Sequence, residues 1–201
     1  MTTMTKSETT IANILAAAAS LFTARNYADV TMDQISLACN VTKGALYHHF
    51  ASKEELYLEL MHSDLEYKRA LFQAAIDKGS DCRDRLSRVT EVFFDLPEVS
   101  RGVMRLVRRD INIFGEPART SLVKAYQASL PELIEGVIRD GIRDGELAPA
   151  DPRLLSWQFV ALVEVMLSDY ADRSFSDADA KLDYVMELFF SGAGSRQGVD
   201  E

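Results

Sequence analysis

The chain has 201 residues, of which 47% are apolar and 26% charged, so its composition is that of a globular protein and excludes a disordered, collagen-like or disulfide-scaffold chain. It contains no run of 18 apolar residues, which argues against a membrane-spanning helix, and we expect no signal peptide. The two cysteines, Cys39 and Cys82, are interpreted as free thiols of a cytoplasmic protein.

The net charge of −9 is distributed unevenly along the chain. Residues 1–50 carry equal numbers of acidic and basic side chains, so the whole excess of negative charge lies in residues 51–201. A neutral N-terminal part can bind phosphate groups if a few cations and helix N-termini are well placed. The acidic remainder predicts weak non-specific binding to DNA, because it repels the duplex.

Helical patterns cover almost the whole chain and strand patterns are absent, which predicts an all-α fold of about nine helices. The first helix is expected over residues 7–25, because its apolar residues recur at helical spacing on one face. The Gly- and Ser-containing end, residues 192–201, is expected to be a disordered tail. The longer helices that follow the first 52 residues are predicted at 53–78, 82–96, 99–113, 117–144, 152–172 and 177–191. Pro131, inside the segment 117–144, is expected to mark either a kink or a helix start.

Two short capped helices with a tight turn between them are predicted within residues 31–50. The segment Thr31–Gln34 has the pattern of a capping box, which opens the first of these helices. Asn40 tolerates the left-handed backbone that closes a helix, and Thr42 can cap a second helix that ends near Phe50. This arrangement is typical of a helix-turn-helix, whose second helix enters the major groove of DNA.

The outer face of this motif offers several side chains for contacts with DNA. Lys43 can donate to guanine O6 and N7 or to phosphate, and the Tyr47 hydroxyl can donate to phosphate. A glycine at position 44 is unfavourable in a helix, but it would allow the backbone to approach the groove closely. The expected contact residues are Thr31, Thr42, Lys43, Gly44, Tyr47, His48 and Lys53.

The run Gly44–Phe50, with the sequence GALYHHF, and the segment Lys53–Leu56 resemble the signature of the TetR family of transcriptional regulators. The resemblance extends from about Ile11 to Met61. It implies a helix-turn-helix DNA-binding domain at residues 1–52 and a helical ligand-binding and dimerisation domain at residues 53–191.

The resemblance further implies a ligand-responsive repressor that binds a palindromic operator as a homodimer. The last two predicted helices would pair with those of the second copy. A small, largely apolar inducer would bind in the C-terminal domain and release the DNA. The alternatives are an all-α enzyme or carrier of an apolar metabolite that keeps the helix-turn-helix as a scaffold, and a DNA-binding dimer without a ligand.

Four residues of the C-terminal part are candidates for binding the inducer: Arg105, Tyr126, Trp157 and Glu164. Arg105 belongs either to a solvated basic face or to an inward-facing site for a carboxylate. Tyr126 and Trp157 combine an apolar ring with a polar edge, which suits a partly hydrated cavity. Glu164 interrupts an apolar helix and is either an acid of the pocket or a group at the dimer interface.

No pattern in the sequence indicates a catalytic site, a metal site or a cofactor. No nucleophilic triad and no glycine-rich phosphate loop is recognisable. The spacing of Glu59 and His62 matches half of a di-iron helix motif, but the motif would have to occur twice, and no second copy is present. We therefore predict a protein that is not an enzyme.

Overall fold

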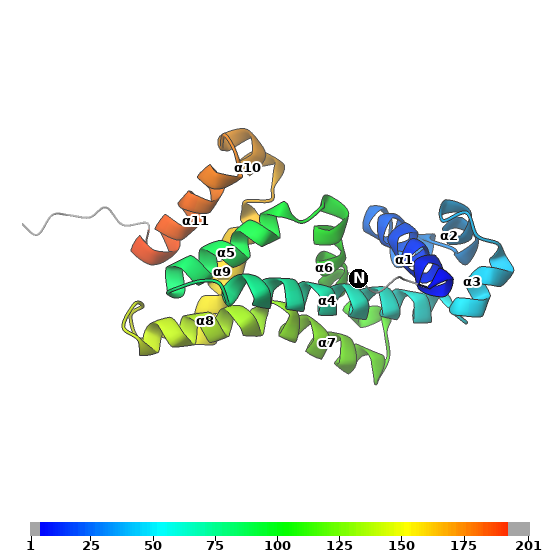
Figure 1. Cartoon of the computed structure of the whole chain (residues 1–201), viewed down its shortest axis with the longest axis horizontal. Coiled ribbons are helices and arrows are strands. Elements are labelled where there is room, and N and C mark those ends of the chain that lie inside the picture. Colours follow the sequence, from blue (N-terminus) through cyan, green and yellow to red (C-terminus); the bar gives the residue numbers. More distant parts are fainter. Residues whose placement is uncertain (1–4, 193–201) are drawn as a thin grey trace, which may run out of the picture. The chain divides into compact units, whose positions relative to one another are not determined.

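The computed structural model describes residues 5–192, and this part of the chain consists of helices and loops without any strand (Figure 1). The predicted all-α fold is confirmed. Within the same residues, no helix combines the length and apolar character that crossing a bilayer requires. Except for Gly192, the predicted tail lies outside the described residues. The α-helices are α1 (Lys6–Ala24), α2 (Met32–Ala38), α3 (Lys43–His49), α4 (Lys53–Ile76), α5 (Cys82–Asp95), α6 (Glu98–Asp110), α7 (Ala118–Ser129), α8 (Pro131–Arg143), α9 (Pro152–Val165), α10 (Asp169–Ser174) and α11 (Ala178–Ser191), and two 3-10 turns lie at Tyr27–Asp29 and Ile111–Ile113.

The described residues form eleven α-helices where about nine are predicted, because two of the predicted helices are interrupted. The segment 117–144 forms two helices, and of the two alternatives for Pro131, a kink or a helix start, the structure has the start. Leu130 leaves helical geometry, and Pro131, which has no N–H to donate to the preceding turn, begins α8. The prediction of one helix over 152–172 is wrong, because the chain turns after α9 and Ser168 caps a separate helix, α10.

The chain forms two compact units, each made of two segments. The first unit contains residues 5–68 and 96–127, and the second contains residues 69–95 and 128–192. These units are defined by packing. The functional border predicted between residues 52 and 53 stays a prediction.

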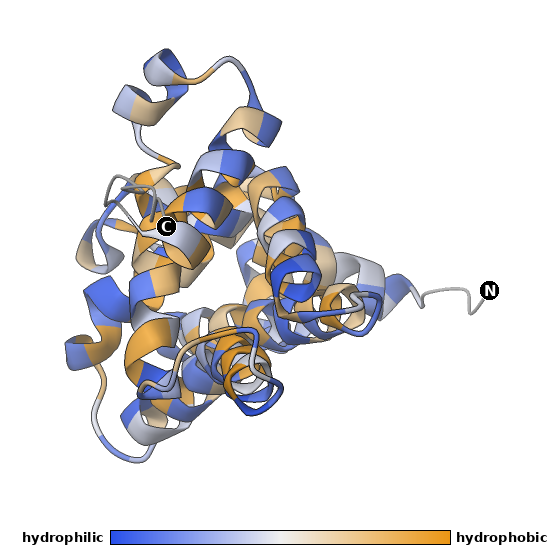
Figure 2. Ribbon diagram, turned by 90° about the vertical axis from the view of Figure 1, so that its left-hand side faces the viewer, coloured by the Kyte–Doolittle hydropathy of each residue, from blue (hydrophilic) through white to orange (hydrophobic). Residues whose placement is uncertain are grey.

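In the first unit, α1 packs against α2, and α2 packs against α3. The apolar stripe predicted for the first helix is confirmed, because Ile14, Ala18 and Phe22 are fully buried. Ile35 of α2 and Leu46 of α3 are buried as well. The ribbons in Figure 2 carry both hydrophobic and hydrophilic residues, as expected of helices with one face toward the core and one toward solvent.

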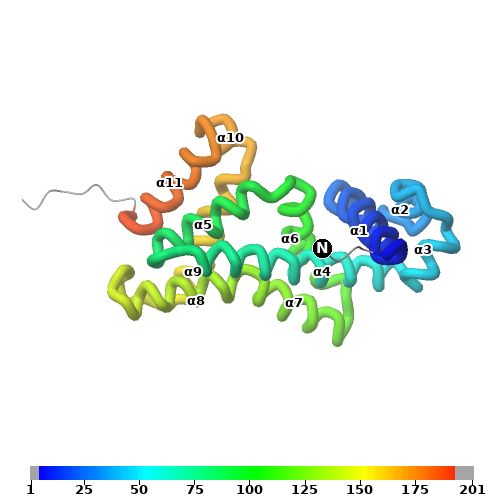
Figure 3. The backbone as a smooth tube through the Cα atoms, viewed as in Figure 1, coloured from blue at the N-terminus to red at the C-terminus, as the bar shows by residue number. Residues whose placement is uncertain are grey.

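Helix α6 also packs against α1 in the first unit (Figure 3). At this contact Gly102 is buried, and a Cβ added to it would lie 2.8 Å from Cγ2 of Thr23. Such a distance is shorter than real Cβ contacts. The close approach of the two helices therefore depends on the missing side chain of Gly102.

A fully buried lysine joins α4 to α6 in this unit. The Lys68 ammonium donates to the carboxylate of Asp64, four residues earlier on α4, and to the backbone carbonyl of Ser100 on α6. Burial lowers the pKa of Lys68 and raises the pKa of Asp64, because it disfavours the charged form of each group. The charge of each partner opposes this effect of burial on the other, because an ion pair favours both charged forms.

In the second unit, α5 packs against α8 and α11, and α9 packs against α8 and α11. Cys82, at the start of α5, lies against Gly141 of α8, and its backbone N–H donates to the Glu146 carboxylate over 2.8 Å. Helix α9 leaves an apolar stripe exposed, which includes Leu154, Trp157 and Val165. These residues lie on one helical face, because they are separated by three and eight positions.

Candidate functional site

The helix-turn-helix predicted between Thr31 and Phe50 is present as α2 and α3. Asn40 adopts the left-handed backbone expected of it, with φ of 53°. The N–H of Val41 donates to Ser36 O over 3.0 Å, and the N–H of Asn40 donates to Leu37 O over 3.2 Å. These two bonds are those of a Schellman motif, so the sharp turn that leads into α3 is defined by backbone hydrogen bonds.

Threonine side chains cap both helices of the motif. Thr31 Oγ1 accepts from Gln34 N over 3.2 Å and Gln34 Oε1 accepts from Thr31 N over 3.0 Å, which confirms the predicted capping box. Thr42 Oγ1 accepts from Ala45 N over 3.1 Å at the start of α3. Each hydroxyl still has its own proton to donate, so a cap and a phosphate contact are compatible.

Helix α3 is anchored on one side and free on the other. Leu46 and Phe50 are buried and hold the helix against the core. The ring of His48 contacts the ring of His49, with centroids 5.3 Å apart, and His49 is half-buried. The exposed residues of this segment are the predicted contacts Thr42, Lys43, Gly44, Tyr47 and His48.

Lys43 forms an ion pair that joins the two helices of the motif. Its Nζ lies 2.7 Å from Oδ1 of Asp33, in the first turn of α2. Both side chains are more than half exposed, at 59% for Lys43 and 65% for Asp33. The hydrogen bond to Asp33 and the charge of that carboxylate raise the pKa of Lys43. Lys43 therefore remains a cation at neutral pH and has a carboxylate as its partner on the outer face of the motif.

Gly44 has no packing reason to be a glycine. Its φ is not positive, and no heavy atom lies within 4 Å of a Cβ added to it. An alanine would therefore fit in the free protein and would favour the helix. The open space at Gly44 agrees with a glycine that lets a binding partner approach the helix backbone from outside.

Lys53 has a structural contact that the sequence did not suggest. Its ammonium donates to the carbonyls of Tyr27 and Val30, over 2.8 Å each, and lies 4.2 Å from the centroid of the Tyr27 ring. It thereby ties the start of α4 to the loop that precedes α2. The predicted phosphate contact of Lys53 would have to be made in addition to these bonds, or in their place.

The half-motif of Glu59 and His62 does not extend to a metal site in residues 5–192. That part of the chain contains no cluster of three or more His, Cys, Asp or Glu side chains placed to hold an ion. His62 Nε2 instead lies 3.4 Å from Oγ of Ser121 on α7.

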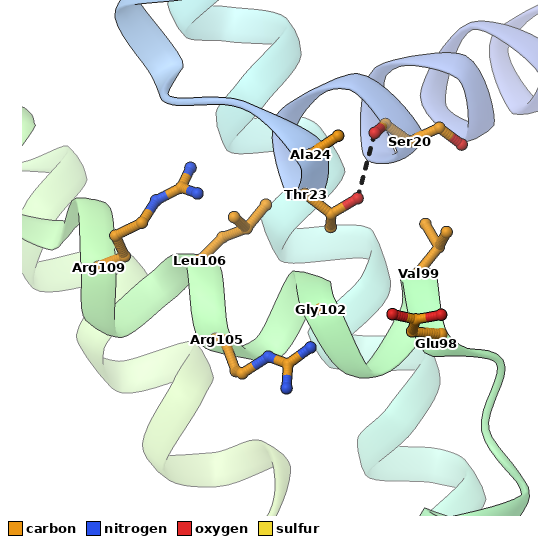
Figure 4. Close-up of a pocket in the computed structure, with 9 residues that line it drawn as sticks. All are labelled: Ser20, Thr23, Ala24, Glu98, Val99, Gly102, Arg105, Leu106 and Arg109. Carbon is orange, nitrogen blue, oxygen red and sulfur yellow. Dashed lines mark hydrogen bonds between the residues drawn. The ribbon is translucent and has the colours of Figure 1, made fainter. Parts of the chain in front are cut away.

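A surface groove of about 500 Å³ lies between α1 and α6. In Figure 4, Ser20 and Thr23 line it from α1, while Glu98, Arg105 and Arg109 are among the lining residues of α6. The groove therefore combines charged groups with apolar side chains beside the crossing of these two helices. The predicted ligand residue Arg105 is exposed in it.

Arg109 connects this crossing to a buried network. Its guanidinium donates to both carboxylate oxygens of Asp110, over 2.8 and 2.7 Å, and to the carbonyls of Phe22 and Arg25 near the end of α1, over 3.2 Å each. Asp110 also accepts from the hydroxyl of Tyr57, a fully buried residue of α4. Burial and this hydrogen bond raise the pKa of Tyr57. The end of α6 is thus bonded to both α1 and α4.

Comparison with known protein families covers most of the chain. Residues 14–60 match the family model described as bacterial regulatory proteins, tetR family. Residues 76–187 match the model described as tetracyclin repressor-like, C-terminal domain. The chain belongs to the TetR family. The resemblance found in residues 11–61 is thereby confirmed, and it extends into the C-terminal part.

Similar proteins of this family include transcriptional regulators from several bacteria. The chain is 26% identical over 157 residues to the uncharacterized HTH-type transcriptional regulator YhgD of Bacillus subtilis. This alignment covers 78% of this chain and 82% of YhgD. It is 30% identical over 149 residues to the transcriptional activator FasR of Mycolicibacterium smegmatis, and this alignment covers 74% of this chain and 66% of FasR. The fold is similar to that of AibR, solved in complex with isovaleryl coenzyme A and operator DNA, with a TM-score of 0.71, 21% identity and coverage of 90% and 98% of the two chains.

The remaining ligand candidates of this TetR-family chain lie in both units. Tyr126 is half-buried on α7 in the first unit, and Glu164 is half-buried on α9 in the second. Trp157 is 52% exposed on α9, with the Arg153 guanidinium 5.5 Å from its ring centroid. The groove lined by Arg105 includes none of these three residues. Their roles in ligand binding stay predictions.

Besides the contacts of Lys53, sequence reasoning missed two features of the site. Asp33 was not expected to pair with Lys43, because the two residues lie ten positions apart on either side of a turn and no local pattern joins them. The network of Arg109, Asp110 and Tyr57 was also missed, because it depends on the packing of helices that are distant in the sequence. The polar Asp110 at the end of an amphipathic helix was the one available signal, and it is equally typical of a solvent-exposed residue.

Proposed function

We propose that this chain is a homodimeric transcriptional repressor, not an enzyme, that binds a palindromic operator through α2 and α3. The observation that carries this proposal is the exposed first turn of α3, where Thr42, Lys43 and Gly44 face outward while Leu46 is buried behind them. In helix-turn-helix proteins, residues at this place contact base edges in the major groove. The repressor role follows the description of the matching C-terminal family model.

Contacts to the DNA backbone would hold the motif in register. We assign these contacts to the Thr31 hydroxyl and the N-terminal end of α4 at Lys53, which flank α3 in sequence. The exposed Tyr47 and His48 of α3 itself would add further contacts of this kind. Because a bacterial operator lies in the cytoplasm, we place the protein there.

The exposed stripe on α9 supports dimerisation through α9 and α11. Leu154, Trp157 and Val165 would be covered by a second copy, and the exposed Tyr184 of α11 offers another aromatic contact. Large exposed apolar surfaces of this kind mark interaction sites. Dimerisation would set the two α3 helices about one helical turn of DNA apart, roughly 34–36 Å, as a palindrome requires. In this proposal, Trp157 serves the dimer interface.

The effector that we propose is a small compound with an apolar part and an anionic group. The structure similar to this chain that contains operator DNA also contains an acyl coenzyme A thioester, so acyl thioesters are the first class to test. Arg105 is exposed in the groove beside the α1–α6 contact, where its guanidinium is available to an anionic group. Binding there would act on α1, which lines the groove and packs against α2 of the DNA-binding motif.

Selection of bound DNA from a random-sequence pool, with the purified protein at moderate salt, tests the function. We expect a two-fold symmetric consensus, and we expect Lys43→Ala to weaken operator binding about tenfold or more while the protein remains a dimer. Lys124→Ala removes an exposed cation from α7 and should bind as the unmodified protein does. If the folded dimer enriches no sequence, the helix-turn-helix is a scaffold and the interpretation as an enzyme or carrier gains support.

A further inference from the structure

The ion pair of Lys43 and Asp33 lies where the proposed function places base contacts. Lys43 is the first residue of α3, and Asp33 lies in the first turn of α2, so the pair bridges the two helices of the motif. Both side chains are exposed on that surface. The pair therefore presents a donor and an acceptor side by side, with a separation of 2.7 Å between Nζ and Oδ1.

A G·C base pair presents the complementary arrangement in the major groove. Guanine O6 is an acceptor, and cytosine N4 carries a donor hydrogen that is not used in pairing. These two atoms are themselves joined by a Watson–Crick hydrogen bond, so they lie about 2.9 Å apart. That spacing matches the separation of the lysine nitrogen and the carboxylate oxygen. An ammonium has three donors and a carboxylate has several acceptor positions. Both groups can therefore keep their mutual bond while Lys43 adds two bonds to a guanine and Asp33 adds one to a cytosine.

We propose that Lys43 and Asp33 act together to recognise one G·C base pair in each half of the operator. Lys43 donates to guanine O6 and N7, and Asp33 accepts from cytosine N4. This inference rests on the proposed function, and it adds a second specificity residue that lies outside the recognition helix.

The polarity of the pair sets an order of preference among base pairs. With C·G or A·T at the same position, the ammonium faces an amino group and the carboxylate faces a carbonyl, so both contacts are repulsive. With T·A, the polarity is correct, but the thymine methyl group lies beside O4 and no N7 is on the side of the ammonium. We therefore expect G·C first, T·A second, and the other two base pairs last.

The test is DNA selection with the full-length protein and three variants. Asp33→Ala removes the acceptor, and Lys43→Ala removes the donor. Asp29→Ala is the matched control, because Asp29 is an exposed acid of the same neutral N-terminal part but is bonded to Asn26 and not to a cation. Thermal unfolding confirms that each variant is folded. A second measurement compares binding to the selected operator with binding to the same operator carrying A·T at the assigned position.

We expect Asp33→Ala and Lys43→Ala to relax the same base pair of each half-site, while Asp29→Ala leaves the consensus unchanged. The change to A·T should weaken binding of the unmodified protein about tenfold and that of Asp33→Ala less than about threefold. The inference is wrong if the unmodified protein does not prefer G·C there, if the two variants relax different positions, or if Asp33→Ala behaves like Asp29→Ala. If the unmodified protein enriches no symmetric site, the proposed function itself fails, so the two failures can be told apart.

Discussion

Replacing Gly44 by alanine should separate the stability of the protein from its binding to DNA. A Cβ at this position would have no heavy atom within 4 Å, and the residue has no positive φ, so the methyl group adds no strain. Alanine is preferred over glycine within a helix by about 0.5–1 kcal/mol. The free energy of unfolding should therefore rise by up to about that amount, which corresponds to an increase in melting temperature of roughly 1–4 °C for a chain of this size.

Operator binding should change in the opposite direction. If the α3 backbone approaches the base edges at Gly44, a methyl group at that place holds the helix away, and the affinity should fall at least about tenfold. Thermal unfolding measures the first effect, and fluorescence anisotropy with the selected operator measures the second.

Gly136→Ala in α8 is the matched control. No heavy atom lies within 4 Å of a Cβ added there either, so it should add similar stability without changing operator affinity. A less stable Gly44→Ala protein would refute the conclusion that the position is open in the free chain. A Gly44→Ala protein that binds the operator as tightly as Gly136→Ala does would refute the close approach of the backbone to DNA.

Three further predictions concern the interior. Lys68→Met leaves the Asp64 carboxylate without its cation and should lower the free energy of unfolding by about 3–5 kcal/mol, whereas the double variant Lys68→Met/Asp64→Leu should recover most of the lost stability. If urea unfolding shows that the single and double variants lose the same stability, the prediction for this buried pair is wrong. Gly102→Ala places a methyl group 2.8 Å from Cγ2 of Thr23 and should lower the free energy of unfolding by about 1–3 kcal/mol in the same measurement. An unchanged stability would mean that α6 and α1 can move apart without cost. Burial raises the pKa of Cys82 to about 12, so its thiol stays protonated at pH 8. Iodoacetamide should therefore label only Cys39 in the native protein and both cysteines in urea, and rapid labelling of Cys82 in the native protein would contradict this.

The helical class, the position of the helix-turn-helix and its caps could be predicted from the sequence because they depend on local interactions. A capping box needs only Thr31 and Gln34, and the left-handed turn needs a residue such as Asn40 at one position. The sequence left a kink and a helix start open at Pro131, and it did not predict the break before Ser168. Periodicity continues across Pro131 and Ser168, and at such places the tertiary packing of the flanking segments decides whether the chain bends or breaks.

The sequence by itself determined that this protein is helical, that it carries a DNA-binding motif near its N-terminus and that Lys43 lies on the exposed side of that motif. Only the tertiary structure decided the partners of the charged groups. Asp33 meets Lys43, and Lys53 turns inward to two carbonyls, because the packing of neighbouring helices sets which side chains come within hydrogen-bond distance. Arg109 likewise joins α6 to α1 across more than 80 residues of chain. Such long-range pairs leave no periodic pattern in a single sequence, since their spacing along the chain is set by the fold.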